Sequence, residues 1–135
     1  MKEISLPYHL IIPTIISILI LGILFYKRKK LFINDKNKVF WISVILFFCI
    51  YLLIVGNATY THYSTNILLQ SFDLNKDGNF NTAEITPEFN IAMRNVISDT
   101  GRNFSFITGL LFSGIITSFV YVIGTKINQY KNNKL

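Results

Sequence analysis

Oxygen-bearing side chains recur at alternate positions in one polar stretch of the sequence, residues 73–84. The stretch reads Asp73-Leu74-Asn75-Lys76-Asp77-Gly78-Asn79-Phe80-Asn81-Thr82-Ala83-Glu84. Carboxylate and amide oxygens are the ligands that hard divalent cations prefer. The rest of the sequence has no Ser/His/Asp order, no glycine-rich phosphate loop and no zinc-ligand spacing. The residue types therefore favour cation binding, and we expect no enzyme activity.

All 12 positions of this stretch resemble the calcium-binding loop of an EF-hand. The resemblance implies Ca²⁺ as the cofactor and six ligands: Asp73, Asn75 and Asp77 through side-chain oxygens, Asn79 through its backbone carbonyl, Asn81 through a water, and Glu84 through both carboxylate oxygens. Gly78 occupies the sixth position, where a Cβ would resist the sharp turn. The alternative interpretation is a solvated polar turn that binds no metal.

Apolar residues flank this loop at helical spacing. They are Leu68, Leu69 and Phe72 before it, and Ile85, Phe89, Ala92, Met93 and Val96 after it. We therefore expect a helix–loop–helix unit. Thr86 and Pro87 resemble an N-cap and a first helical residue, so the second helix should restart at Thr86. No second loop of this kind occurs, so a lone hand needs support from the membrane spans, a second copy or another subunit.

The composition indicates a membrane protein. Of 135 residues, 51% are hydrophobic and 15% charged, and the mean hydropathy is +0.44. Three runs without a charged residue, 4–26, 39–60 and 104–125, each supply the roughly 20 residues that a membrane-spanning helix needs. The predicted fold class is all-α, with three transmembrane helices and the EF-hand on the outer side between spans two and three. Because basic residues lie beside apolar runs, the net charge of +6 points to a membrane surface and not to nucleic acid.

Basic residues also predict the orientation of the chain. Residues 27–38 and 125–135 together hold nine of the 13 Lys and Arg, which places them in the cytoplasm and makes the topology N-out, C-in. The expected segments are an outer N-terminus with span one (1–26), a basic cytoplasmic loop (27–38), span two (39–60), the extracytoplasmic EF-hand segment (61–103), span three (104–125) and a basic cytoplasmic tail (126–135). Basic residues follow the first span, unlike a cleaved signal peptide, so we expect it to be an anchor. Abundant Ile, Asn and Lys suggest an AT-rich genome and a bacterial inner membrane.

Small residues recur four apart on the third span, at Ser105, Gly109, Ser113 and Thr117. Such spacing lets two helices approach closely, either within the chain or against another membrane protein or a second copy. We expect a calcium-binding accessory or regulatory subunit of a larger membrane complex. Three carboxylates facing outward predict a weak dissociation constant, about 10⁻⁴–10⁻³ M. The alternatives are a self-associating pore-forming or transport-related protein, and a membrane enzyme that uses His9 and His62.

Overall fold

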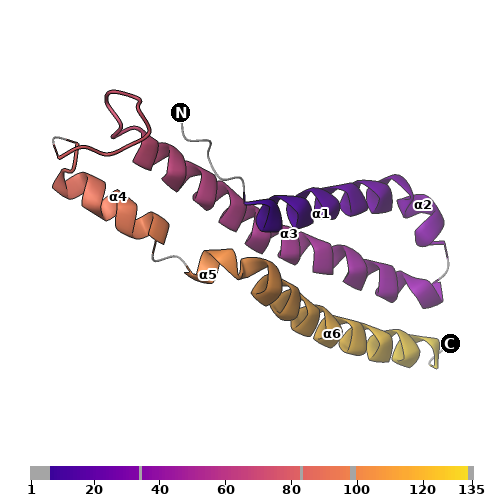
Figure 1. Cartoon of the computed structure of the whole chain (residues 1–135). Helices are drawn as coiled ribbons and strands as arrows, with labels where there is room; N and C mark the ends of the chain where they lie inside the picture. Colours follow the sequence, from indigo (N-terminus) through magenta and orange to yellow (C-terminus); the bar gives the residue numbers. More distant parts are fainter. Residues whose placement is uncertain (1–6, 34, 83, 98–99, 134–135) are drawn as a thin grey trace.

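The described part of the chain consists of helices joined by short turns and one longer loop (Figure 1). The computed structural model describes the backbone of residues 7–33, 35–82, 84–97 and 100–133, and their side chains except at 35, 36 and 132. The helices are α1 (Tyr8–Tyr26), α2 (Arg28–Leu31), α3 (Asp35–Gln70), α4 (Pro87–Ile97), α5 (Thr100–Asn103) and α6 (Ser105–Asn132). Within those ranges there is no β-strand.

Three helices are long and apolar enough to cross a membrane. They are α1, the Asn37–Gln70 part of α3 and the Ser105–Lys131 part of α6. Large apolar side chains lie exposed on all three, among them Leu19 at 60%, Leu53 at 73% and Phe119 at 66%. A surface of this kind suits lipid, because hydrocarbon imposes no cost on exposed apolar groups. The predicted all-α class with three spans is confirmed, and the helices indicate a membrane location.

Helix α3 is longer than a span. Its 36 residues measure about 54 Å at 1.5 Å per residue, against a hydrocarbon core of roughly 30 Å. The helix passes through the expected end of span two at residue 60 without a break. Thr59, Thr65 and Asn66 donate side-chain hydrogen bonds to carbonyls four residues earlier, and neither Gly nor Pro occurs in residues 57–70. The change in polarity therefore coincides with no helix end, and the loop begins at the tip of a continuous rod.

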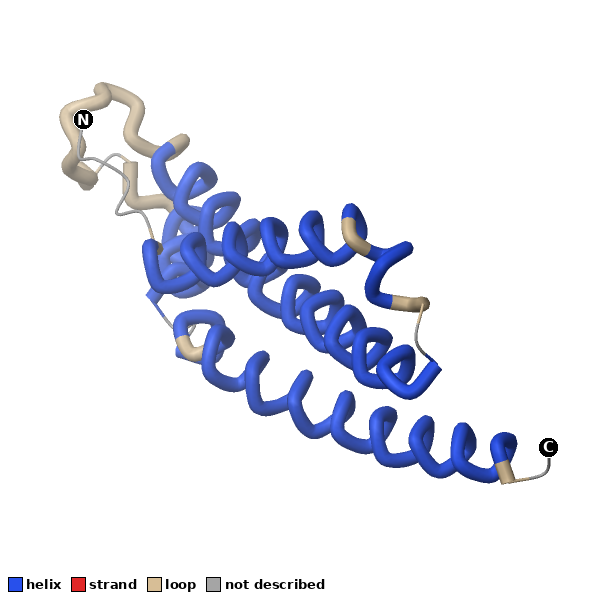
Figure 2. The backbone as a smooth tube through the Cα atoms, turned by 90° about the vertical axis from the view of Figure 1, so that its right-hand side faces the viewer, coloured by secondary structure: helices blue, strands red, loops and turns tan. Residues whose placement is uncertain are grey.

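Helix α3 is also the centre of the packing. It contacts α1 along one side and α6 along another, while α1 and α6 touch little (Figures 1 and 2). The phenol of Tyr51 donates a hydrogen bond of 3.2 Å to the carbonyl of Phe106, which ties α3 to the start of α6. One buried cluster joins the three spans at this level: Leu10, Tyr51, Val55 and Ala58, with Phe106 against them. The three spans thus share a buried core at the end of the bundle nearer the loop.

The predicted small-residue face of α6 lies against α3 within the same chain. Ser105, Ser113 and Thr117 are at most 8% exposed, and a Cβ on Gly109 would lie 3.0 Å from Cγ2 of Ile54 on α3. The intramolecular alternative is the one that the structure shows. Helix α3 thus covers this face within the single chain. Contact of this face with another membrane protein or a second copy stays a prediction.

A second close approach of α6 to α3 occurs at Gly124, where an added Cβ would lie 2.7 Å from Cγ1 of Val39. Val39 is β-branched and stiff in a helix, so it cannot turn away cheaply. We expect Gly124→Ala to destabilise the protein by about 1–3 kcal/mol through overpacking. Gly22→Ala is the matched control, since nothing lies within 4 Å of its added Cβ. Thermal unfolding in detergent measures both, and equal melting temperatures for the two variants would contradict the close approach.

Candidate functional site

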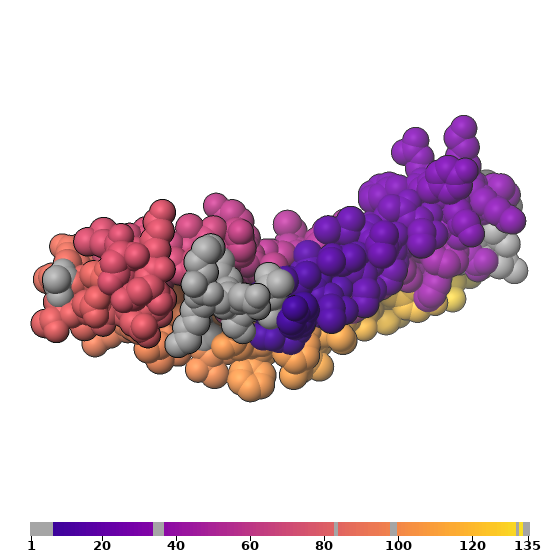
Figure 3. All heavy atoms as spheres, turned by 45° about the horizontal axis from the view of Figure 1, so that its top comes forward, coloured from indigo at the N-terminus to yellow at the C-terminus, as the bar shows by residue number. Residues whose placement is uncertain are grey.

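The loop of residues 71–86 joins α3 to α4 at the end of the molecule opposite the C-terminus (Figure 1). Helix α4 packs back against the end of α3, and together with the loop it forms this end of the molecular surface (Figure 3). The ring of Phe89 on α4 lies 4.6 Å from that of Phe80 in the loop and 5.9 Å from that of Phe72, centroid to centroid. Leu69 and Ala92 complete the buried part of this cluster. Six of the eight apolar residues predicted on the flanks belong to this cluster and hold the loop between two packed helices: Leu69, Phe72, Phe89, Ala92, Met93 and Val96. The other two, Leu68 and Ile85, are exposed.

Glu84 is turned into the loop and is only 6% exposed. Its Oε1 accepts hydrogen bonds from the backbone N–H groups of Leu74 at 2.9 Å and Asn75 at 3.4 Å. Its Oε2 accepts one from the N–H of Asn81 at 2.8 Å. One carboxylate therefore joins the beginning and the end of the loop across ten residues. Backbone N–H groups stabilise its buried charge.

Asp73 is the second carboxylate that faces the loop backbone. Its Oδ2 accepts a 2.9 Å hydrogen bond from the N–H of Gly78, whose φ of 80° is the left-handed conformation expected at that position. Its Oδ1 is buried and has no hydrogen-bond partner within the described residues. Buried carboxylate oxygens rarely lack a partner, because losing water without replacement is costly. Oδ1 of Asp73 is consequently the atom at this site that most needs an electropositive ligand.

The remaining predicted ligands are exposed and form short turns. Oδ1 of Asn75 accepts from the N–H of Asp77 at 3.1 Å, and Oδ1 of Asp77 accepts from the N–H of Asn79 at 2.7 Å. The amide of Asn75 also donates to Oδ2 of Asp77 at 2.9 Å. These bonds curl the chain from residue 75 to residue 79 around its own side chains. The N–H of Asn81 is already held by Glu84.

The six predicted ligands lie on one loop, but the three carboxylates do not meet at one point. Across the described ranges, no three His, Cys, Asp or Glu side chains form a group that would hold a metal ion. Asp73, Asp77 and Glu84 each accept hydrogen bonds from backbone N–H groups of the loop. Cation binding at this loop therefore requires the carboxylates to draw together, and each of them keeps a lone pair for the ion while it accepts these hydrogen bonds.

Helix α4 begins at Pro87, one residue after its cap. The hydroxyl oxygen of Thr86 accepts a 3.2 Å hydrogen bond from the N–H of Phe89, which is the N-cap geometry. The pKa of Glu88 lies below its ordinary value, because its carboxylate accepts hydrogen bonds from its own backbone N–H and from Thr86. The predicted restart of the second helix at Thr86 and Pro87 is confirmed. Glu84 therefore lies in a turn before α4 and not on the helix itself.

Arg102 is a structural residue that sequence reasoning missed. It is 7% exposed and lies on α5, just before the third span. Its guanidinium donates to Oγ1 of Thr65 at 2.9 Å and to the carbonyl of Asn95 at 3.0 Å. These bonds fasten the end of α4 to α3 immediately above α6. The sequence around Arg102 resembles an ordinary turn. The position of an arginine directly before an apolar run was the only signal of its structural role.

The two histidines lie on different helices. His9 is on α1, where its ring packs edge-on against Phe106 at 5.9 Å, and His62 is on α3. Neither belongs to a metal-binding group among the residues that the structure describes.

No protein-family model, no curated protein and no solved structure matches the chain. Any functional assignment accordingly rests on the residues of the loop and on the helices that carry it.

Proposed function

We propose that residues 73–84 bind calcium and that the chain is a calcium-binding integral membrane protein. One observation carries the proposal: Oδ1 of Asp73 is buried without a hydrogen-bond partner among the described residues. The other carboxylate oxygen of Asp73, Oδ2, accepts a hydrogen bond from the N–H of Gly78. A carboxylate oxygen is the kind of ligand that a hard cation prefers. The almost completely buried Glu84 supplies a second carboxylate from the far end of the same loop.

The charge of the loop supports a divalent cation. Three carboxylates and one lysine, Lys76, give residues 73–84 a net charge of −2. The residues that would hold calcium are the six named from the sequence: Asp73, Asn75, Asp77, Asn79, Asn81 and Glu84. When bound, the ion supplies the positive charge that offsets repulsion among the carboxylates. We expect a dissociation constant of about 10⁻⁴–10⁻³ M, as in extracellular modules of this type.

The distribution of basic residues supports an outer location of the loop, which we propose. The basic α2 and the C-terminal end of α6 lie at one end of the bundle, and the loop lies at the other (Figure 1). Residues 57–103 hold five acidic and three basic residues, whereas 27–38 and 125–135 hold one acidic and nine basic residues. By the positive-inside rule, the basic end faces the cytoplasm. The proposed setting is a bacterial inner membrane, with the loop on the outer side.

Cysteine labelling tests this orientation. In a Cys49→Ser background, cysteines at Lys29 and Lys131 should be protected from impermeant thiol reagents in intact cells, while one at Asn90 should react. All three should react after the membrane is permeabilised, which controls for burial. Labelling at Lys131 together with protection at Asn90 would put the loop in the cytoplasm, and the weak affinity expected for an outer site would lose its basis.

We further propose that the protein is an accessory or regulatory subunit of a membrane complex. Residues 39–60 and 104–125 contain no ionisable Asp, Glu, Lys, Arg or His, so a path for ions through the monomer lacks its usual mark. The loop is joined to the spans through the uninterrupted α3 and through the bonds of Arg102. Ordering of the loop by calcium would therefore reach the membrane helices, where a partner subunit can respond to it.

Purification from the native membrane tests the subunit role. A partner should copurify with the wild-type protein in millimolar calcium, and less of it should remain in chelator or with Glu84→Gln. The rival function, a self-associating pore, is tested in the same preparation by release of dye from liposomes. If the protein alone releases dye and no partner copurifies in either condition, the accessory role is contradicted and the pore is supported.

A further inference from the structure

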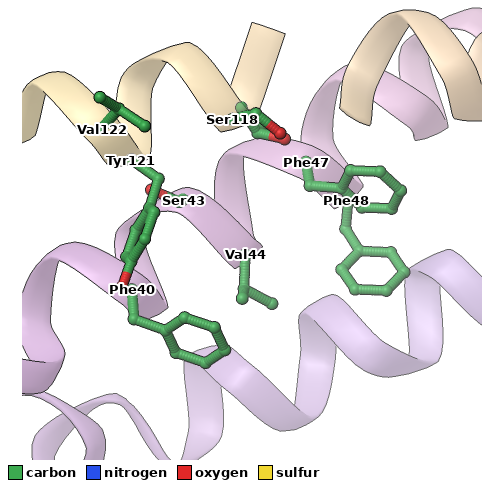
Figure 4. Close-up of a pocket in the computed structure, with 9 residues that line it drawn as sticks. Phe40, Ser43, Val44, Phe47, Phe48, Ser118, Tyr121 and Val122 are labelled. Atoms are coloured by element: carbon green, nitrogen blue, oxygen red, sulfur yellow. The ribbon is translucent and has the colours of Figure 1, made fainter. Parts of the chain in front are cut away.

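A groove lies between α3 and α6 (Figure 4). Its lining residues lie nearer the basic end of the bundle than the loop. Its volume is about 610 Å³, within the range of roughly 300–1,000 Å³ that is usual for ligand sites. The close approach at Gly109 lies on the loop side of the groove along α6, and the one at Gly124 lies on the basic side. Between those contacts lie the aromatic residues of the groove, among which Phe40 and Tyr121 meet edge to face with their ring centroids 6.3 Å apart.

The walls of the groove are mostly apolar, although four of the lining residues carry a hydroxyl group: Ser43, Thr117, Ser118 and Tyr121. Ser43 donates to the carbonyl of Val39, Thr117 to that of Ser113 and Ser118 to that of Gly114. These three hydroxyls are thus used inside their own helices, and the fourth is the phenol of Tyr121. Such a surface suits a hydrocarbon chain better than a polar ligand.

The basic end of the molecule supplies the complementary feature. Lys38 precedes Phe40 by two residues, and Lys126 follows Val122 by four, or about 6 Å along the helix. Both lysines are exposed. The contact between Gly124 and Val39 brings the two segments that carry them together. Along their helices, both lysines therefore lie just beyond the basic end of the groove, near its aromatic residues Phe40 and Tyr121, at the level where the headgroup of an interfacial lipid would lie.

We infer that this groove binds one anionic phospholipid, with an acyl chain between α3 and α6 and the phosphate near Lys38 and Lys126. The occupant is identified by charge complementarity. The segments 27–38 and 125–135, at this end, hold nine basic residues and one acidic residue, so a zwitterionic headgroup would gain much less from them than an anionic one. The groove is separate from the calcium loop and needs no calcium.

Native mass spectrometry of the full chain in non-ionic detergent with chelator tests the inference. Phosphatidylglycerol and phosphatidylcholine with the same acyl chains are added at equal concentrations. The wild type should retain phosphatidylglycerol at least about fivefold better, the effect expected from one lysine near a surface. Lys38→Gln/Lys126→Gln should lose this preference, whereas Lys76→Gln/Arg94→Gln, with the same change in charge at the loop end, should keep it.

Filling the groove separates chain binding from headgroup binding. Ser118→Trp should reduce retention of both lipids, and Thr108→Trp, on the same helix outside the groove, should not. Equal retention of the two lipids by the wild type would overturn the site, and that comparison does not depend on whether any variant folds. A lipid-free mass of two chains, lost in Ser118→Trp, would assign the groove to a second copy and would also overturn it.

Discussion

Glu84→Gln should weaken calcium binding by about a factor of ten or more. The substitution keeps the size of the side chain but removes one of only three carboxylates, and calcium affinity in such loops depends on the number of charged ligands. It also replaces an acceptor oxygen with an NH₂ group, which would face the backbone N–H groups of Leu74, Asn75 or Asn81. Even without calcium, we therefore expect a loss of about 1.5–3 kcal/mol of stability.

Glu88→Gln is the matched control, because it makes the same chemical change four residues away on an exposed side chain at the start of α4. Isothermal titration calorimetry of both variants in detergent measures the effect on affinity. The control should bind calcium as the wild type does. If Glu84→Gln and Glu88→Gln bind calcium equally well, Glu84 is not a ligand, and the EF-hand interpretation of the loop fails.

Calcium should stabilise the whole chain and not only the loop. Binding to the folded state alone contributes roughly 1.4 kcal/mol when the ion is at ten times its dissociation constant, which raises the melting temperature by a few degrees. The effect should spread because Phe80 in the loop packs on Phe89 of α4, and Arg102 ties α4 to α3. Magnesium should stabilise less, since it demands a smaller octahedral shell.

Melting curves in chelator, in millimolar calcium and in millimolar magnesium measure this stabilisation. Asp73→Asn is the informative variant, because it keeps an acceptor for the N–H of Gly78 and removes the charge beside it. Its melting temperature should depend much less on calcium than that of the wild type. A calcium shift of equal size in both proteins would indicate general screening of charge and would remove the loop from the explanation.

The spans and the restart of the second helix were predictable because they depend on local sequence. A run of about 20 apolar residues has few alternatives to a membrane helix, and Thr86 before Pro87 specifies a helix start by its own hydrogen bonding. The continuity of α3 through residue 60 was not predicted, because the change from apolar to polar residues was interpreted as an end of the span. Polarity reports where a helix leaves the lipid, and only Gly, Pro or a cap reports where it stops.

Features that depend on which helices contact each other could not be predicted from the sequence. The small-residue face of α6 fitted either α3 or a partner equally well, and only the close approach of Gly109 to Ile54 distinguishes them. The role of Arg102 depends on Thr65, 37 residues earlier in the chain. At the candidate site, the residue types named the ligands, but the positions of their carboxylates also depend on backbone N–H groups that no pattern of side chains reveals.

The most direct test of calcium binding by residues 73–84 is an NMR titration of ¹⁵N-labelled protein in detergent micelles. The informative signals are the backbone N–H groups that donate to Asp73 and Glu84: Leu74, Asn75, Gly78 and Asn81. Since calcium must draw these carboxylates together, we predict that these signals shift together and saturate, with a dissociation constant near 10⁻⁴–10⁻³ M, while the signal of Gly22 stays in place. Absence of a saturable shift at these four amides up to about ten times that concentration would contradict calcium binding by the loop.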